Sequence, residues 1–458
     1  MSSLTGSLSI GVNALLADQG ALEATTNNIA NANTAGYSRE VANFSEATPQ
    51  VEGNLVYGQG VNLQSITSVR DRLLELSMDQ ATQQQSGAQA QLSSLQQIQN
   101  LFSSTTSGIG TDLSAFFNSL NQLSTDPASI PDRQSVLAAA NNLASDLHST
   151  SAQLTTVQSN LNLNVTQSVD QINQLTSQIA GLNTQVASLQ KLGTDPGAIE
   201  DQRDQLETQL SQIAGVSIAQ TTDGDTITLG NGTALVVAGQ SYALQSSTNP
   251  SGNQQVLDYS GQNITSTIQG GQLGGVLQVR DQFLPTVTSA LDDLAGGLAT
   301  NFNTVHEQGF DLSGNPGQAF FNDTSGAGAA ANFSVAITDP SLIAASSDGS
   351  AGSNGNLAAL QAVQAQALPS GQTPTNAYSD LTFSVGNATS QAQAAQSAAQ
   401  LSLTQITDQR QAVSGVSIDE EATNLIRYQN SYSAAARVIT TVDELTQVLM
   451  NMATAVIS

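Results

Sequence analysis

Residues that could do chemistry are few in this chain of 458 residues. It has two histidines, His148 and His306, and no cysteine, so a cysteine nucleophile, a thiolate metal site and a disulfide are excluded. His306 and Glu307 would begin a zinc-protease motif, but the second histidine, which belongs three residues after the glutamate, is absent. We therefore expect both histidines to have solvated or turn-capping roles.

Other catalytic or binding motifs are incomplete as well. Asp311, Ser313 and Asn315 resemble the start of a calcium loop, but Pro316 and Asn322 stand where the turn glycine and the bidentate glutamate belong. A helix exit and structured turn is the preferred interpretation. The Gly-Ile-Gly sequence at 108–110 follows no expected strand, so its dinucleotide signal is very weak. We expect no catalytic residue, no cofactor and no metal.

Charge and hydropathy argue against binding to nucleic acid or membranes and against membrane-spanning segments. Lys and Arg number 10 against 36 Asp and Glu, for a formal charge of −26, so nucleic acid and anionic membranes are improbable partners. No apolar run approaches the roughly 18 residues of a membrane span. The N-terminus has neither a basic residue before Arg39 nor an apolar core, so we expect no cleavable secretory signal. The length predicts two to four domains.

The two chain ends predict long helices. Ser417 and Glu420 form a capping box that begins a helix of about 38 residues, and Leu4 to Asn33 predicts a second helix with a heptad seam. On periodicity alone, the second could equally be a surface helix of a globular domain. Each stripe needs a partner, so we expect the two helices to pair side by side and antiparallel. The expected interface residues are Leu8, Val12, Leu15, Leu22, Ile29, Leu425, Tyr428, Tyr432, Ile439, Val442 and Leu449.

An unusual asparagine-rich string, TTNNIANANTAGYSRE, follows the first stripe from Thr25 to Glu40. Side-chain amides can bond the free carbonyls of a helix end, and glycine can adopt positive φ, so an ordinary C-cap and turn would account for it. The string is also similar to the signature of bacterial flagellar rod, hook and hook-associated proteins, and the C-terminal stripe resembles their terminal helix. The signature residues are Asn27, Asn28, Asn31, Asn33, Thr34, Gly36 and Tyr37.

The middle of the chain predicts a helical body with a β-rich excursion. Leu143, Leu161, Ile179, Leu206 and Leu210 are expected in the core of a long helical hairpin over 132–214. At Val216 the apolar period changes to two, and an Asp-Gly-Asp turn at 223–225 predicts a hairpin. Further helices are expected over 70–102, 113–123, 273–308 and 388–413, and more β structure and loops over 333–385.

Two internal stretches, 201–239 and 301–321, resemble the hook–filament junction members of this family. The resemblance implies a non-catalytic, extracellular protein of the flagellum that joins hook to filament, is required for filament assembly and is exported unfolded through the type III channel. It implies contacts with copies of itself, with hook protein and with a second junction protein, and a chaperone on the C-terminal helix. The alternatives are a hook or rod protein, or an axial protein with a surface enzyme in its β-rich insert.

The expected fold is mainly α, with long bundle or coiled-coil domains built from both chain ends and a β-rich outer part. The expected domains are 1–66 with 416–458, which line a tube; 67–215 with 273–308 and 388–415, a bundle of long helices; 216–272, a β-rich excursion; and 309–387, a β-rich or loop domain.

Overall fold

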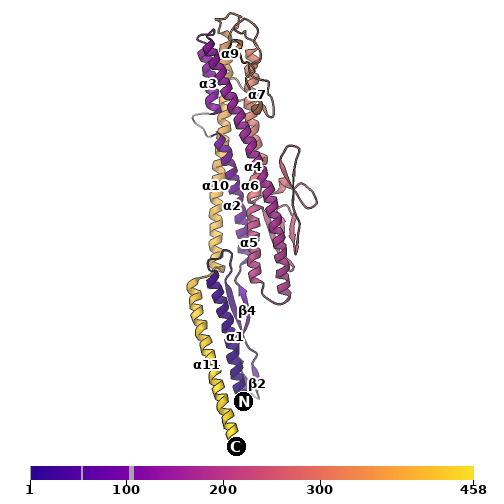
Figure 1. Cartoon of the computed structure of the whole chain (residues 1–458), viewed down its shortest axis with the longest axis vertical. Coiled ribbons are helices and arrows are strands. Elements are labelled where there is room, and N and C mark those ends of the chain that lie inside the picture. The colour runs from indigo at the N-terminus through magenta and orange to yellow at the C-terminus, as the bar shows by residue number, and fades with distance from the viewer. Residues whose placement is uncertain (1, 53–54, 103–107, 458) are drawn as a thin grey trace.

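The computed structural model describes residues 2–52, 55–102 and 108–457. The molecule is elongated, with both chain ends at one pole, a body of long helices, a cap at the far pole and a β-rich arm on one side (Figure 1). The expectation of a mainly helical fold with small β inserts is confirmed. Within the described ranges, no helix is both long enough and apolar enough to cross a membrane.

The terminal region pairs the first and last helices. α1 (Ser2–Asn31) and α11 (Ile418–Ile457) pack along each other, and both chain ends emerge together (Figure 1), so the expected antiparallel pair is confirmed. One half of the expected capping box is present, because the Glu420 N–H donates to Ser417 Oγ at 3.5 Å, while the Glu420 carboxylate pairs with Arg39 at 3.2 Å. Close packing depends on glycine: a Cβ on Gly11 would lie 2.9 Å from Ile439 Cγ1.

A β ladder that was not predicted from the sequence covers α1. β1 (Glu40–Glu46) pairs antiparallel with β4 (Val61–Ser68), with a register shift between Asn43 and Phe44. Two shorter strands, β2 (Gln50–Glu52) and β3 (Leu55–Tyr57), pair between them. The terminal region is therefore a helix pair with a β layer.

The body consists of long helices that confirm the expected helical hairpin. α4 (Ile130–Lys191) has 62 residues and is N-capped by Ser129, and α5 (Gly197–Ile213) folds back along its end. α2 (Arg72–Phe102) packs along α10 (Pro374–Ser414), and α3 (Ile109–Leu123) packs on α4. Four predicted core residues are at most 1% exposed, and Leu206 packs partly buried against them; the four are Leu143, Leu161, Ile179 and Leu210.

The helix predicted over 273–308 is interrupted. It consists of α6 (Gly271–Gln278), a π-helical turn η2 (Val279–Phe283) and α7 (Leu284–His306). Arg280 in this turn is 2% exposed, and its guanidinium donates to Gln254 O and Asn162 Oδ1. The turn thus ties the body to the arm.

The β-rich arm forms as predicted. β5 (Val216–Thr221), β6 (Gly224–Leu229), β7 (Ala234–Val237) and β8 (Gln240–Ser241) make one antiparallel sheet in that order. β9 (Gln245–Thr248) and β10 (Gln254–Leu257) make a second, followed by the short η1 (Thr265–Thr267). Gly224 turns the first hairpin at φ 114°.

Of the β structure and loops predicted over 333–385, the loops are present, β pairing is limited to isolated bridges at Val335 and Ser346, and the strand expected at 381–385 is wrong. This stretch holds η3 (Pro340–Leu342), α9 (Gly355–Ala362), η4 (Val363–Ala365) and the first part of α10, and α8 (Ala329–Asn332) precedes it. The alternating residues 381–385 suggested a strand, but Leu381 and Val385 are buried while Phe383 is 73% exposed. Positions four apart share a helix face, so this burial pattern is that of a helix. The residues belong to α10, which begins at Pro374 after the N-cap Thr373.

Candidate functional site

The asparagine-rich signature lies where the terminal region meets the body. Asn28 is 1% exposed, and its Nδ2 donates to Glu40 O at 2.8 Å. Its Oδ1 accepts from the Glu40 N–H and from the Tyr37 hydroxyl, both at 2.8 Å. One amide side chain therefore joins the end of α1 to the start of β1.

The other signature residues build the helix exit. Asn31 Nδ2 donates to Asn27 O at 3.1 Å and to Asn27 Oδ1 at 2.9 Å, and Thr34 Oγ1 donates to Asn31 Oδ1 at 3.2 Å. Asn33 is exposed. Gly36 has φ +80°, and a Cβ there would lie 2.7 Å from Gln205 Nε2. The turn is thus a helix exit, as its composition suggested, and it also contacts the body.

α5 is the docking helix for this turn. Asp201 accepts from Ser38 Oγ at 2.8 Å and from the Ser38 N–H at 3.2 Å. Gln205 Nε2 donates to Ala35 O at 2.6 Å. From α10, Arg410 Nη2 donates to Gly36 O at 3.0 Å. These contacts fix the N-terminal helix against the body.

Charged side chains concentrate at the same place. Arg70, between β4 and α2, pairs with Asp201 at 2.6 Å and with Asp204 at 3.0 Å. Arg72 and Arg203 both pair with Asp225 Oδ2, at 3.0 and 3.1 Å. We define the junction cluster as Arg70, Arg72, Glu75, Asp79, Glu200, Asp201, Arg203, Asp204, Glu207, Asp225 and Arg410.

Burial alters the acidity of this cluster. It raises the pKa of Glu75 to about 7 and that of Asp79 to about 6, because the charged forms lose solvation. Burial, followed by repulsion from Asp225 and Asp204, raises the pKa of Glu207 well above its ordinary value. A cavity of about 610 Å³ adjoins the cluster, and Glu75, Asp79 and the signature turn line it.

Asp204, Glu207 and Asp225 each offer an oxygen within 4.8 Å of the others, a spacing that could hold a metal ion. The guanidinium groups of Arg72 and Arg203 contact these carboxylates at 3.0 to 4.0 Å. Two cations already face the three acids, so the arrangement is that of an ion-pair network.

This cluster was not predicted from the sequence, because its members come from α2, α5, α10, β6 and a linker. A signal existed, however. The chain has only ten Lys and Arg, and four of them belong to the cluster. In a chain with 36 acidic residues and few basic ones, the position of each arginine indicates where carboxylates are paired.

The predicted interface residues divide into two groups. Val442 is buried, and Leu15, Leu22, Ile29, Leu425, Tyr428 and Ile439 are partly buried. Leu8, Val12, Tyr432 and Leu449 are between 38% and 43% exposed. The buried positions of α1 are instead mainly small or polar: Gly11, Ala17, Asp18, Gly20, Ala21, Ala24, Thr25 and Asn28.

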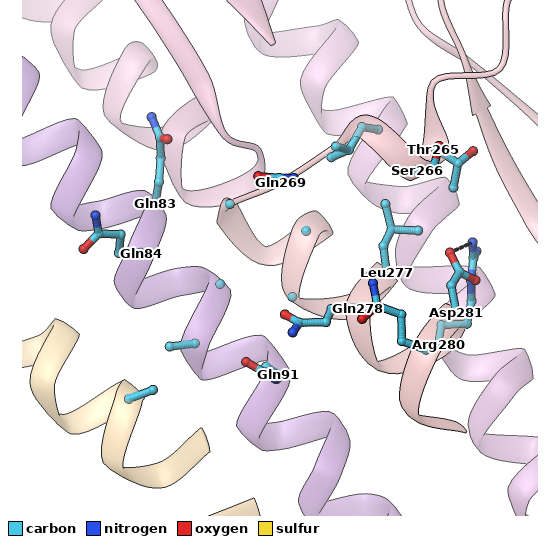
Figure 2. A pocket seen from close by; sticks show the side chains of 18 of the residues that line it. Gln83, Gln84, Gln91, Thr265, Ser266, Gln269, Leu277, Gln278, Arg280 and Asp281 are labelled. Carbon is cyan, nitrogen blue, oxygen red and sulfur yellow. Dashed lines mark hydrogen bonds and ion pairs between the residues drawn. The ribbon is translucent and has the colours of Figure 1, made fainter. Parts of the chain in front are cut away.

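A cavity of about 1050 Å³ lies between α2, α6, α10 and the arm. Figure 2 shows neutral amides such as Gln83, Gln84 and Gln278 around it, and a bonded charge pair, Arg280 with Asp281. This lining has the chemistry of a polar groove. It does not offer separate acid and base groups for catalysis.

His306 is fully buried, so of the solvated and turn-capping roles expected for it the solvated one is wrong, and its ring bonds the backbone of two loop segments. Its Nδ1 bonds Gln318 O at 2.6 Å, and its Nε2 accepts from the Ala344 N–H at 2.9 Å. His148 is exposed beside Ala331 O. Asp311 Oδ1 accepts from the N–H groups of Ser313 and Asn315, which is the structured turn expected there.

Three protein families match the chain. Residues 95–321 match the flagellar hook-associated protein FlgK helical domain, residues 8–37 the flagella basal body rod protein, and residues 408–452 the flagellar basal body rod FlgEFG protein C-terminal region. The first match spans most of the body and the arm, and the other two cover the terminal helices.

Relatives match over the whole length. Flagellar hook-associated protein 1 of Bacillus subtilis is 31% identical, with 96% of each chain covered. That of Escherichia coli is 29% identical over 99% of this chain and 100% of the relative. The flagellar hook junction protein FlgK from Burkholderia pseudomallei shares the fold with a TM-score of 0.67 at 21% identity, covering 74% of this chain and all of that one.

Proposed function

Since the chain belongs to the flagellar hook-associated protein 1 family, it is a structural, non-catalytic component of the extracellular flagellum at the hook–filament junction, and we propose that its paired terminal helices make the subunit contacts there. Membership of this family removes the hook or rod alternative. The surface-enzyme alternative has no support in the cavity lining described above.

The exposure of large apolar side chains on the terminal pair supports this proposal. On α1, Leu16 is 59% exposed, and on α11, Ile426, Val448 and Met450 are between 53% and 64% exposed. Burying one such side chain is worth about 1.5–3 kcal/mol. Several large apolar side chains exposed on one helix pair are typical of a surface that contacts other proteins. Neighbouring subunits would cover it.

We propose the same interface residues that the sequence predicted, with different roles. Val442 and the partly buried residues hold α1 against α11 within one subunit. Leu8, Val12, Tyr432 and Leu449 contact neighbouring subunits. The neighbours are copies of this chain, with hook protein on one side and a second junction protein on the other. Before export, a chaperone holds α11.

The division into units is also proposed. The terminal unit is 1–66 with 416–458, and the body is 67–215 with 273–308 and 388–415. The arm is 216–272. The outer domain, proposed over 309–387 from sequence, contributes its last residues to α10, which begins at Pro374.

Gene deletion with complementation in a motile host tests the role of the terminal pair. Deletion should leave hooks without filaments and release flagellin into the medium. Complementation with Val12→Asp or Val448→Asp should fail to restore filaments. The matched control is Val237→Asp, a similarly exposed valine on the arm, which should restore them. Full motility with both interface variants would contradict the proposal.

A further inference from the structure

Two of the three connections between the terminal region and the body contact one helix, α5, and the third contacts the signature turn that α5 holds. Ser38 and Arg70, on the first two crossings of the chain, both contact Asp201 of α5. The third crossing follows Arg410, which bonds Gly36, and the Arg39 N–H donates to Ser414 O at 3.0 Å. The orientation of the terminal region therefore depends on the groups around α5.

These groups carry a charge imbalance. α2 contributes Arg72, Glu75 and Asp79. β6 contributes Asp225, α10 contributes Arg410 and the linker contributes Arg70. The members on α5 are Glu200, Asp201, Arg203, Asp204 and Glu207. Seven carboxylates thus face four guanidinium groups.

The excess charge is poorly solvated. Glu207 and Asp225 have no exposed surface, and Glu75 is 6% exposed. One oxygen on each of these three, and one on Asp204, lacks a hydrogen-bond partner within the described chain. The other oxygen of Glu75, Glu207 and Asp225 pairs with an arginine. Because seven carboxylates share four guanidinium groups, a proton is the simplest additional cation to compensate the buried negative charge.

We propose that the junction cluster is a proton-controlled lock, which takes up protons as the pH falls below neutral and then holds the terminal region firmly against the body. As the pH rises, the ionised acids repel one another and the contacts of α5 with the signature turn and the β4–α2 linker loosen. This inference is independent of the proposed subunit contacts.

The direction follows from linkage. The pKa values of Glu75, about 7, and Asp79, about 6, lie above the ordinary value near 4. Between about pH 4 and 7 the locked state binds more protons than the open one, so its stability falls as the pH rises through this window. The buried state of Glu207 adds to the same trend.

Hydrogen exchange on the full chain at pH 5.5 and pH 8 tests the lock. After correction for intrinsic exchange, protection over 36–40 and 68–75 should be at least about tenfold higher at the lower pH, since one proton of linkage gives tenfold per pH unit. Residues 143–179 of α4, away from the cluster, serve as the internal reference. Equal protection of the junction at the two pH values overturns the proposal.

Variants identify the groups responsible. Glu75→Gln/Asp79→Asn mimics the protonated state, and the amide introduced by the second substitution can still accept from Thr208, so the pH ratio should fall toward one with high protection retained. Glu207→Gln should reduce the ratio as well; if it does not fold, the double variant decides. Asp170→Asn, on the exposed face of α4, should keep the full ratio. A ratio unchanged in the double variant, or equal protection induced by Ca²⁺ at pH 8, would overturn the proton assignment.

Discussion

The side-chain amide of Asn173 in α4 pairs with the backbone of Leu244 in the arm, donating to its C=O and accepting from its N–H, both at 2.8 Å. Asn28 pairs with Glu40 in the same way. An amide side chain on a helix thus stands in for a β-strand neighbour, and it needs no charge to do so.

Replacing Asn173 with alanine should loosen the arm. The C=O and N–H of Leu244 would lose their partner, which costs about 1–3 kcal/mol for buried groups. Hydrogen exchange over 240–257 should accelerate, while exchange in α10 stays unchanged. Asn33→Ala, at an exposed asparagine, is the control and should have little effect. An arm that stays fully protected would show that the amide pair does not hold it.

Truncating the core of α4 should destabilise the body. Leu161 is 1% exposed and Ile179 is fully buried, so Leu161→Ala or Ile179→Ala should cost about 2–5 kcal/mol. Leu163→Ala removes the same atoms at a position that is 60% exposed, and should cost less than about 0.5 kcal/mol. Denaturant unfolding followed by circular dichroism measures all three. Losses below about 0.5 kcal/mol at both core positions would show that the stripe faces water.

The cap should weaken in acid, opposite to the junction cluster. Burial lowers the pKa of His306 to about 4, whereas an unfolded histidine titrates near 6.5. Neutral His306 contributes about 3 kcal/mol to the free energy of unfolding. This contribution is complete above about pH 6.5 and is lost as the pH falls toward 4. After correction for intrinsic exchange, protection over 310–346 should therefore fall between pH 7 and 4.5.

Substitution separates this effect from general acid sensitivity. His306→Gln should remove the pH dependence of the cap in that window. His148→Gln, at the exposed histidine, should leave the profile as it is. If the two variants behave alike, His306 is not the titrating group.

The terminal pair should order fully only on assembly. Within one chain the fully buried positions of α1 are mainly small or polar, and Leu8, Val12, Leu16, Ile426 and Val448 remain exposed. Ordering some 70 residues costs on the order of 70–140 kcal/mol of backbone entropy, which this limited burial does not offset. Exchange on the soluble chain should show 4–33 and 420–455 unprotected and 132–214 slow. Similar protection in both regions would refute this expectation.

Apolar periodicity was sufficient to predict the long helices, but it did not predict the junction cluster. The stripe from Leu143 to Ile179 has a helical period over many turns, so few alternatives compete with it. Around Phe383 only five residues alternate, and a strand and a helix face fit them equally well. The β1–β4 ladder was missed because Phe44 and Val41 are partly exposed and too sparse to form a clear pattern.

The signature was read correctly as a helix exit, because Asn31 and Gly36 act locally. Its contacts with α5 could not be predicted from the sequence, because they join residues far apart along the chain. The same holds for Arg72 with Asp225, which no local spacing relates. Sequence therefore predicts the elements here better than the charges that orient them.

α10 runs as one helix of 41 residues from Pro374 in the cap to Ser414 at the junction. At 1.5 Å per residue it is a stiff lever about 60 Å long, so a tilt of about 10° at Ser414 would move Pro374 by about 10 Å. If copies of the chain assemble through their terminal helices as proposed, small differences in angle at Ser414 would become large displacements at the far end of the molecule. Such an assembly could present its outer surfaces at different spacings while its inner contacts barely change.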